Sequence, residues 1–281
     1  MQVAIAANGG SFTADVAGPE RGELVLLLHG FPQTRHTWRA ELAALAAAGH
    51  RAVAPDQRGY SPGARPAGIE SYRIESLVAD ALALADALGA ERFHLVGHDW
   101  GGHLAWILAA REPRRVRTLS VLSRPHPAAF ARALREDPEQ ANRSRHHRAH
   151  QSADATDWWL ADGAARLRSA LHGQGVPESD VAVYLATLGE RAAMDAALHW
   201  YRAAGSSGLA AADVPPVEVP TLYVWGTSDA TVGRPAAEAT RAFVKAPYRF
   251  VELPGIGHFV TDQAPAAFPP LLLEHVAPRA A

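Results

Sequence analysis

The sequence contains no cysteine, which excludes disulfide bonds, thiolate metal sites and a cysteine nucleophile. Long apolar runs are also lacking, and none approaches the roughly 20 residues that a membrane-spanning helix needs. The N-terminal segment has no basic region and reaches Asn8-Gly9-Gly10 too soon for a signal peptide. We therefore expect a soluble, cytoplasmic protein without a membrane partner.

A strong charge imbalance is missing as well. The 27 basic and 29 acidic residues among 281 give a formal net charge of -2, so there is no electrostatic reason to expect nucleic acid as a partner. Hydrophobic residues make up 48% of the chain and charged residues 20%, a balance typical of a soluble globular protein with a large core. The composition thus favours an ordinary globular protein of enzyme size.

Short apolar runs and helical segments alternate through the first half of the chain. The run that ends at Leu28 is continuously apolar after Glu23, which is typical of a strand buried on both faces of a parallel sheet. The alternation up to Leu122 predicts an α/β fold with helices on both faces of that sheet. The predicted strands are Gln2–Ala7, Ser11–Ala17, Glu23–Leu28, Arg51–Pro55, Arg92–Val96 and Val116–Leu122, and the predicted helices are Trp38–Ala48, Ile74–Leu88 and Gly101–Arg111.

The alternation stops between Pro125 and Asp213, where only helical segments rich in alanine, arginine and aromatic residues are found. The strand pattern resumes at Pro220–Gly226. We therefore predict one α/β core, residues 1–124 and 214–281, with a helical cap, residues 125–213, inserted in it. The last predicted elements are a helix at Arg234–Val244, a strand at Arg249–Leu253 and a helix at Ala266–Val276.

Asp99 stands at the sharpest junction of the chain. A predicted strand leads into Gly97-His98-Asp99-Trp100-Gly101, and a helical pattern follows at once. Gly-x-nucleophile-x-Gly between a strand and a helix is the pattern of a nucleophile elbow. A carboxylate here could instead cap the helix, but an ordinary cap does not need glycine on both sides. The pattern favours Asp99 as a nucleophile that the helix N-terminus keeps ionised.

Two further residues follow late strands. Asp229 comes just after Pro220–Gly226, and His258 comes just after Arg249–Leu253. Loops at the carboxyl ends of parallel strands gather at one edge of the sheet, where Asp99 also lies. The order nucleophile, acid, histidine is that of α/β-hydrolases. The other position for the acid, after Val116–Leu122, offers no carboxylate, so Asp229 is the better candidate.

The segment His29-Gly30-Phe31-Pro32 directly follows the first buried strand. The backbone amide of Phe31, with that of Trp100 after the nucleophile, would supply the two donors of an oxyanion hole. A simple strand-ending turn would explain Gly30 but not the meeting of these loops at one edge. We therefore place His29, Phe31, Pro32 and Trp100 at the oxyanion and substrate-binding side of the site.

These motifs together resemble those of the epoxide hydrolase branch of the α/β-hydrolase superfamily, over essentially the whole core. The resemblance implies that Asp99 attacks an alkyl carbon of a small apolar epoxide. It also implies that His258, held by Asp229, activates the water that releases a vicinal diol, and that no cofactor is needed. The similar segments are His29-Gly-Phe-Pro32, Asp56-Gln-Arg-Gly-Tyr-Ser61, Gly97-His-Asp-Trp-Gly-Gly102 and Gly257-His258-Phe259.

Epoxide hydrolases typically donate hydrogen bonds to the epoxide oxygen from two cap tyrosines. Leu198-His-Trp-Tyr201-Arg202 resembles the segment that carries the second of them, so Tyr201 is expected in that role. Where the family often has the first tyrosine, this chain has the histidine-rich segment Arg143–Gln151. His146 is the expected substitute, and His147 remains the alternative. A metal site at His146 and His150, one helical turn apart, lacks a third ligand nearby.

Two related chemistries and one silent alternative remain. Haloalkane dehalogenases usually carry asparagine where this chain has Phe31, and haloacetate dehalogenases follow the nucleophile with arginine where this chain has Trp100. Both departures favour epoxide hydrolysis over dehalogenation. A catalytically silent ligand-binding member of the fold is the alternative from another class, against which the complete set of catalytic residues argues. The sequence leaves a homodimer open.

Overall fold

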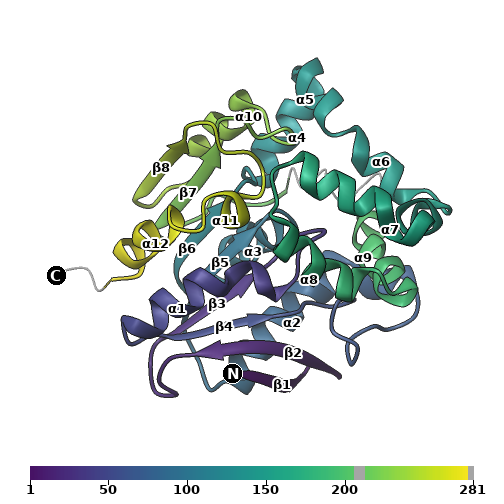
Figure 1. Ribbon diagram of the computed structural model, residues 1–281. Helices are drawn as coiled ribbons and strands as arrows, with labels where there is room; N and C mark the ends of the chain where they lie inside the picture. Colours follow the sequence, from purple (N-terminus) through teal and green to yellow (C-terminus); the bar gives the residue numbers. More distant parts are fainter. Residues whose placement is uncertain (206–212, 278–281) are drawn as a thin grey trace.

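The computed structural model describes residues 1–205 and 213–277. Over these residues its core is an eight-stranded sheet in the order β1-β2-β4-β3-β5-β6-β7-β8 (Figure 1). The first two strands form the predicted antiparallel hairpin, and β3 to β8 run parallel to one another. The strands are β1 Gln2–Ala7, β2 Gly10–Ala17, β3 Leu24–Leu28, β4 Arg51–Pro55, β5 Phe93–His98, β6 Val116–Leu122, β7 Thr221–Gly226 and β8 Tyr248–Leu253.

Strand β3 shows why the sheet is covered on both sides. All five of its residues are buried, as the uninterrupted apolar run predicts. Because side chains alternate across a strand, Leu26 and Leu28 enter the hydrophobic core on one face, whereas Val25 and Leu27 enter the core on the other. Two separate cores therefore fix the central strands, and with them the loops at the strand ends.

Helices cover each of these cores. Leu45 of α1 and Leu272 of α12 bury one face, whereas Leu84 of α2 and Leu104 of α3 bury the other. In the described ranges no helix has both the length and the apolarity to span a membrane. The helices of the core are α1 Arg39–Ala47, α2 Ile74–Ala87, α3 Trp100–Arg111, α10 Arg234–Ala239, α11 Val260–Gln263 and α12 Phe268–Val276.

The predicted boundaries of the last two helical segments are corrected. The segment Arg234–Val244 is not one helix, because α10 ends at Ala239 and a 3-10 turn follows over Thr240–Phe243. The terminal helix begins at Phe268, so that its two prolines occupy the first turn. Proline is tolerated there because the first N–H groups of a helix have no partner within it.

In the described part of the chain, six helices lie between β6 and β7, and we call this segment the cap. They gather at the upper right of the sheet in Figure 1, over the loops that follow the parallel strands. The division at 124/125 and 213/214 stays our proposal, and residues 206–212 of the predicted cap lie outside the described residues. The cap helices are α4 Pro127–Glu136, α5 Pro138–Arg143, α6 Arg145–Gln151, α7 Ala155–Gly173, α8 Glu178–Leu188 and α9 Arg191–Ala204.

A buried acid in α1 leads to a prediction about stability. Glu41 is completely buried, no ion pair to it is found among the described residues, and burial raises its pKa to about 8. A carboxyl group whose pKa is raised on folding makes the folded state lose stability as pH rises from about 4.5 through 8. We expect Glu41→Gln to increase the free energy of unfolding by roughly 2–4 kcal/mol at pH 8.5, and by much less at pH 5.

Urea unfolding at the two pH values measures this difference. The exposed Glu20→Gln serves as the matched control, because it makes the same change at a position where the carboxylate is not buried. Equal effects of Glu41→Gln at both pH values would contradict the prediction.

Candidate active site

Asp99 occupies a sharp turn between β5 and α3. Its backbone has φ 50° and ψ -116°, a conformation that non-glycine residues rarely adopt and that costs about 1–3 kcal/mol. Among the described residues its side chain makes no capping hydrogen bond to α3. Instead Asp99 Oδ1 accepts the backbone N–H of Phe31 over 3.0 Å. The carboxylate is therefore turned away from the helix and toward the loop after β3, which argues against the helix-cap alternative.

Close packing explains the glycines around this turn. A Cβ atom at Gly97 would lie 2.3 Å from the carbonyl oxygen of Gly101, and one at Gly101 would lie 2.1 Å from that of Leu28. A Cβ atom at Gly30 would lie 2.4 Å from Cβ of Asp99. No side chain fits at these distances, so the elbow and the facing loop both require glycine.

His258 lies between two carboxylates. Its Nδ1 is 3.0 Å from Oδ2 of Asp229, and its Nε2 is 3.4 Å from Oδ2 of Asp99. Asp229 also accepts the backbone N–H groups of Thr231 and Val232 over 2.7 and 3.0 Å, which fixes its orientation. The three residues that the sequence singled out at separate strand ends thus meet in one buried cluster.

Two residues that sequence reasoning missed hold the backbone of His258. Its carbonyl oxygen accepts hydrogen bonds from Nε2 of His98, over 2.9 Å, and from Oγ of Ser123, over 2.8 Å. His98 precedes the nucleophile, and Ser123 follows β6 at the position that carries no acid. The position of Ser123 at a strand end was a usable signal, whereas nothing local in the sequence indicates this contact of His98.

The charges of this cluster reinforce one another. Burial by itself would raise the pKa of Asp99, but the hydrogen bond and positive charge of His258 outweigh it and lower that pKa well below its usual range. Burial would likewise lower the pKa of His258, but the two flanking carboxylates raise it above its ordinary value. At neutral pH the site therefore holds an ionised Asp99 beside a histidine that the carboxylates keep protonated.

The loop after β3 divides into a part that faces the site and a part that supports it. Phe31 and Pro32 line the pocket, whereas His29 does not. The Gln57 N–H donates to Nε2 of His29 over 3.1 Å, so the His29 proton is on Nδ1, which donates to the carbonyl oxygen of Gly30 over 3.0 Å. His29 thus supports the loop through hydrogen bonds and does not line the pocket. The Trp100 amide opens α3, and its role as the second oxyanion donor stays a prediction.

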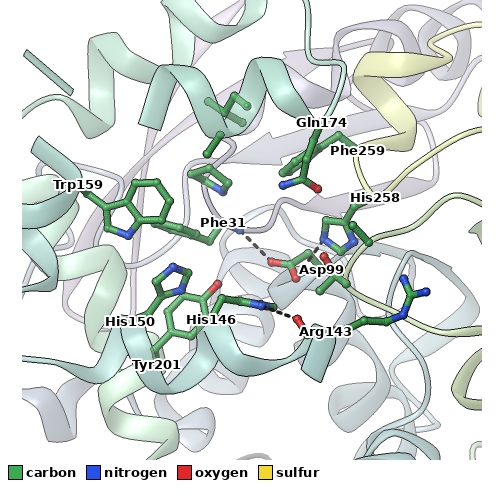
Figure 2. Close-up of a pocket in the computed structure, with 15 residues that line it drawn as sticks. Phe31, Asp99, Arg143, His146, His150, Trp159, Gln174, Tyr201, His258 and Phe259 are labelled. Atoms are coloured by element: carbon green, nitrogen blue, oxygen red, sulfur yellow. Dashed lines mark hydrogen bonds and ion pairs between the residues drawn. The ribbon is translucent and has the colours of Figure 1, made fainter. Parts of the chain in front are cut away.

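A cavity of about 230 Å³ opens above Asp99. In Figure 2, Asp99 lies between His258 on one side and Tyr201 and His150 on the other. Aromatic and aliphatic side chains make up about half of its lining, and polar or titratable side chains make up the rest. The lining residues from the cap are Arg143, His146, His150, Trp159, Ala170, Leu171, Gln174 and Tyr201, and those from the core are Phe31, Pro32, Asp99, Ala230, Thr231, His258 and Phe259.

The two expected cap donors both reach this cavity. The Tyr201 ring packs edge-on against Trp100 and His150, with centroids 5.0 and 4.5 Å apart, and burial raises its pKa well above 10, so its hydroxyl stays protonated. His146 lines the cavity, whereas His147 is buried outside the lining. His150 also lines it, and the sequence had singled it out only as a metal ligand.

The hydrogen bond of His146 restricts what it can donate. Its Nδ1 lies 2.9 Å from the carbonyl oxygen of Arg143, and a carbonyl only accepts, so this nitrogen carries the proton. Neutral His146 therefore leaves Nε2 as an acceptor, and only the imidazolium form has a second N–H to donate. Burial lowers the pKa of His146, so this form becomes populated only as pH falls.

A metal site in this pocket finds no support in the described part of the chain. Among the described residues, the one group with three close potential metal ligands is Glu23, His50 and His94. It lies at the amino ends of the parallel strands, away from the cavity. Neither His146 nor His150 belongs to it. Arg117 lies 3.5 Å from Glu23, and its positive charge opposes a cation at that place.

Comparison with known proteins shows the family to which this chain belongs. Residues 23–265 match the α/β hydrolase fold family, and the chain belongs to that family. It is 31% identical over 307 residues to epoxide hydrolase A of Mycobacterium tuberculosis, covering 95% of this chain and 94% of the relative. It is 33% identical over 279 residues to the AB hydrolase superfamily protein YfhM of Bacillus subtilis, covering 96% and 95%.

The solved structures lead to the same branch. A mutant of an epoxide hydrolase from Bacillus megaterium superposes with a TM-score of 0.89 at 27% identity, covering 98% of this chain and 99% of that one. The chain is thus a member of the epoxide hydrolase branch of the α/β-hydrolase superfamily, and an enzyme of that type. The predicted fold class and resemblance are confirmed.

Proposed function

We propose that this enzyme hydrolyses a small apolar epoxide to a vicinal diol through a covalent ester on Asp99. One observation carries the proposal: a carboxylate stands at the elbow, with Oδ1 held by the Phe31 N–H and Oδ2 facing Nε2 of His258, and Tyr201 lies on the other side of it from His258. A carboxylate nucleophile forms an alkyl ester whose carbonyl belongs to the enzyme, which suits attack at carbon and not ester or amide hydrolysis.

In the first step, Oδ2 of Asp99 attacks an epoxide carbon while the bond from that carbon to the epoxide oxygen breaks. The oxygen leaves as an alkoxide that takes a proton from the Tyr201 hydroxyl. Oδ1 becomes the carbonyl oxygen of the new ester, already at 3.0 Å from the Phe31 N–H. The same N–H then stabilises the oxyanion in the second step.

In the second step, His258 first gives its proton to the Tyr201 phenolate and then, as neutral imidazole, takes a proton from a water molecule, whose oxygen attacks the carbonyl carbon of the ester. As the carboxylate of Asp99 re-forms, the bond from its carbon to the alkyl oxygen breaks, and this oxygen, the former Oδ2, takes the remaining proton of the water molecule and leaves in the diol. The water oxygen remains on Asp99, and the proton that His258 took from water restores the imidazolium of the free enzyme. Asp229 stabilises the imidazolium that forms, as the second carboxylate does in a hydrolase triad.

Loss of the Tyr201 hydroxyl should have an effect that depends on pH. At pH 8 we expect Tyr201→Phe to slow formation of the ester by roughly 10²–10⁴-fold, the range for a general acid. At pH 6 the loss should be smaller, since more His146 is then imidazolium and donates from Nε2. Rapid-quench mass spectrometry of ester formation measures both rates.

The double variant Tyr201→Phe/His146→Phe provides the control for that prediction. It should remove the activity that remains at pH 6. An equal loss in the single variant at both pH values would exclude His146 as the first cap donor.

A substrate panel tests the proposed reaction itself. Terminal, aryl and cyclic epoxides are to be compared with haloalkanes and fluoroacetate, and diol and halide release are to be measured. We expect diol from at least one epoxide class, and no halide, because Phe31 and Trp100 occupy the positions of the dehalogenase side chains. Halide release without diol formation would overturn the proposal.

A further inference from the structure

Asp262 is a buried carboxylate that the proposed chemistry does not use. It lies in α11, four residues after His258, and its side chain has no exposed surface. The chain between the two residues is tightly turned. The Val260 N–H donates to the carbonyl oxygen of His258, and the Asp262 N–H donates to that of Phe259, each over 3.1 Å. A displacement of Asp262 is therefore passed to the His258 backbone within one turn.

Three separate segments bind the Asp262 carboxylate. The Tyr184 hydroxyl, from cap helix α8, donates to Oδ1 over 2.7 Å. Nε2 of Gln33, which directly follows the Phe31-Pro32 pair, donates to Oδ2 over 2.7 Å. Arg39 of α1 lies 3.4 Å from Oδ1. Loss of any one of these donors leaves the buried carboxyl group short of a hydrogen bond that water cannot replace, which is costly.

The cap helix is attached beside this carboxylate a second time. Asp180 lies one turn before Tyr184 on α8 and is itself buried. It accepts hydrogen bonds from Nη2 of Arg39, over 2.6 Å, and from Nε2 of His36, over 3.0 Å. Arg39 thus bridges the two acids. The docking of α8 on the core and the position of Asp262 depend on the same guanidinium.

The next residue in α11 reaches the pocket wall. The side-chain amide of Gln263 donates to the carbonyl oxygen of Gln174, whose side chain lines the cavity. The side-chain oxygen of Gln263 accepts a hydrogen bond from the N–H of Gly257, the residue before His258, over 2.6 Å. The loop that carries the base is therefore connected to the cap on both sides of the histidine.

We propose that Asp262 is a positioning residue that couples the docking of cap helix α8 to the placement of His258. It acts through its hydrogen bond to Tyr184, whose position depends on cap helix α8, and through the single turn of chain between Asp262 and His258. Gln33 extends the same coupling to the loop that supplies the Phe31 N–H. When α8 is docked on the core, the two groups that ester hydrolysis needs, the His258 imidazole and the Phe31 N–H, are held in place.

This inference rests on the proposed function and specifies which step it affects. Formation of the ester depends on Asp99 and the cap donors, whereas its hydrolysis depends on His258. Tyr184→Phe removes one hydroxyl and leaves the ring, so the fold keeps its packing. We expect this variant to slow ester hydrolysis about 10-fold and ester formation less than about 3-fold, with accumulation of the alkyl-enzyme. Asp262→Asn should show the same imbalance more strongly.

Single-turnover reactions with styrene oxide, followed by rapid-quench intact mass, resolve the two steps. Tyr248→Phe is the matched control, because the hydroxyl of this β8 residue has no hydrogen-bond partner in the described part of the structure. It should leave both rates unchanged. Equal slowing of both steps in Tyr184→Phe, or no slowing of either, would overturn the inference.

A second measurement separates this inference from the proposed reaction. The imidazole NMR signals of His258 should shift in Tyr184→Phe and Asp262→Asn but not in Tyr248→Phe, whether or not any epoxide is turned over. Unchanged signals in the first two variants would refute the coupling. If the signals shift as expected and neither the wild type nor His258→Gln ever forms an adduct, only the proposed reaction fails.

Discussion

His258→Gln is expected to convert the enzyme into a trap that forms the ester and fails to release it. Asp99 keeps its position at the elbow and its contact with the Phe31 N–H in this variant, so attack on the epoxide continues. Glutamine cannot take a proton from water, and steady-state diol release should fall by at least about 10³-fold. Intact mass spectrometry should show an increase equal to the mass of the epoxide.

The exposed His172→Gln is the control for that experiment, since this residue lies outside the pocket lining. It should turn over like the wild type and show no adduct. If His258→Gln showed no adduct with any epoxide in the panel, the two-step mechanism would be wrong. Full turnover by that variant would assign the base to another residue.

Asp99→Asn is expected to lose both steps together. The amide is nearly the same size as the carboxylate but carries no charge and is a poor nucleophile, so diol release should fall by at least about 10⁴-fold. No adduct should form, in contrast to His258→Gln. The exposed Asp86→Asn removes one acid elsewhere and should leave the rate unchanged.

An isotope-labelling experiment distinguishes a covalent ester on Asp99 from direct attack of water on the epoxide. In a single turnover of the wild type in ¹⁸O-water, the proposed second step leaves the water oxygen on Asp99, so the peptide that contains it should gain about 2 Da, the mass difference between the two oxygen isotopes. Direct attack of water on the epoxide would place the label only in the diol. Label found only in the diol would therefore exclude the ester even if Asp99→Asn were inactive.

The core and its elbow could be predicted because their signals are local. The run that became β3 is apolar at every position, which fits only a strand with both faces buried. Gly97 and Gly101 stand on either side of Asp99 because no Cβ atom fits beside the crossing backbone. The strand ends then placed Asp229 and His258 at the same edge without any knowledge of the cap.

The site above the elbow could be predicted only in part, since it depends on contacts between distant segments. Which histidines of α6 line the cavity is set by the rotation of that helix, and three histidines within one and a half turns leave this open in the sequence. The Nδ1 bond that restricts His146 depends on a backbone carbonyl, which no residue type encodes. The partners of Asp262 come from α8 and from the loop after β3, far away in the chain.

The position of His258 between two acids makes its acidity depend on the stage of the reaction. Asp229 and Asp99 together keep the imidazole protonated in the free enzyme by raising its pKa. In the proposed mechanism, ester formation converts Asp99 into a neutral group, so one of those two negative charges disappears. The pKa of His258 then falls, and the imidazole gives up its proton when a base is required. In this mechanism, ester formation itself prepares His258 to act as the base for ester hydrolysis. The imidazolium of the free enzyme, in contrast, cannot take a proton from water.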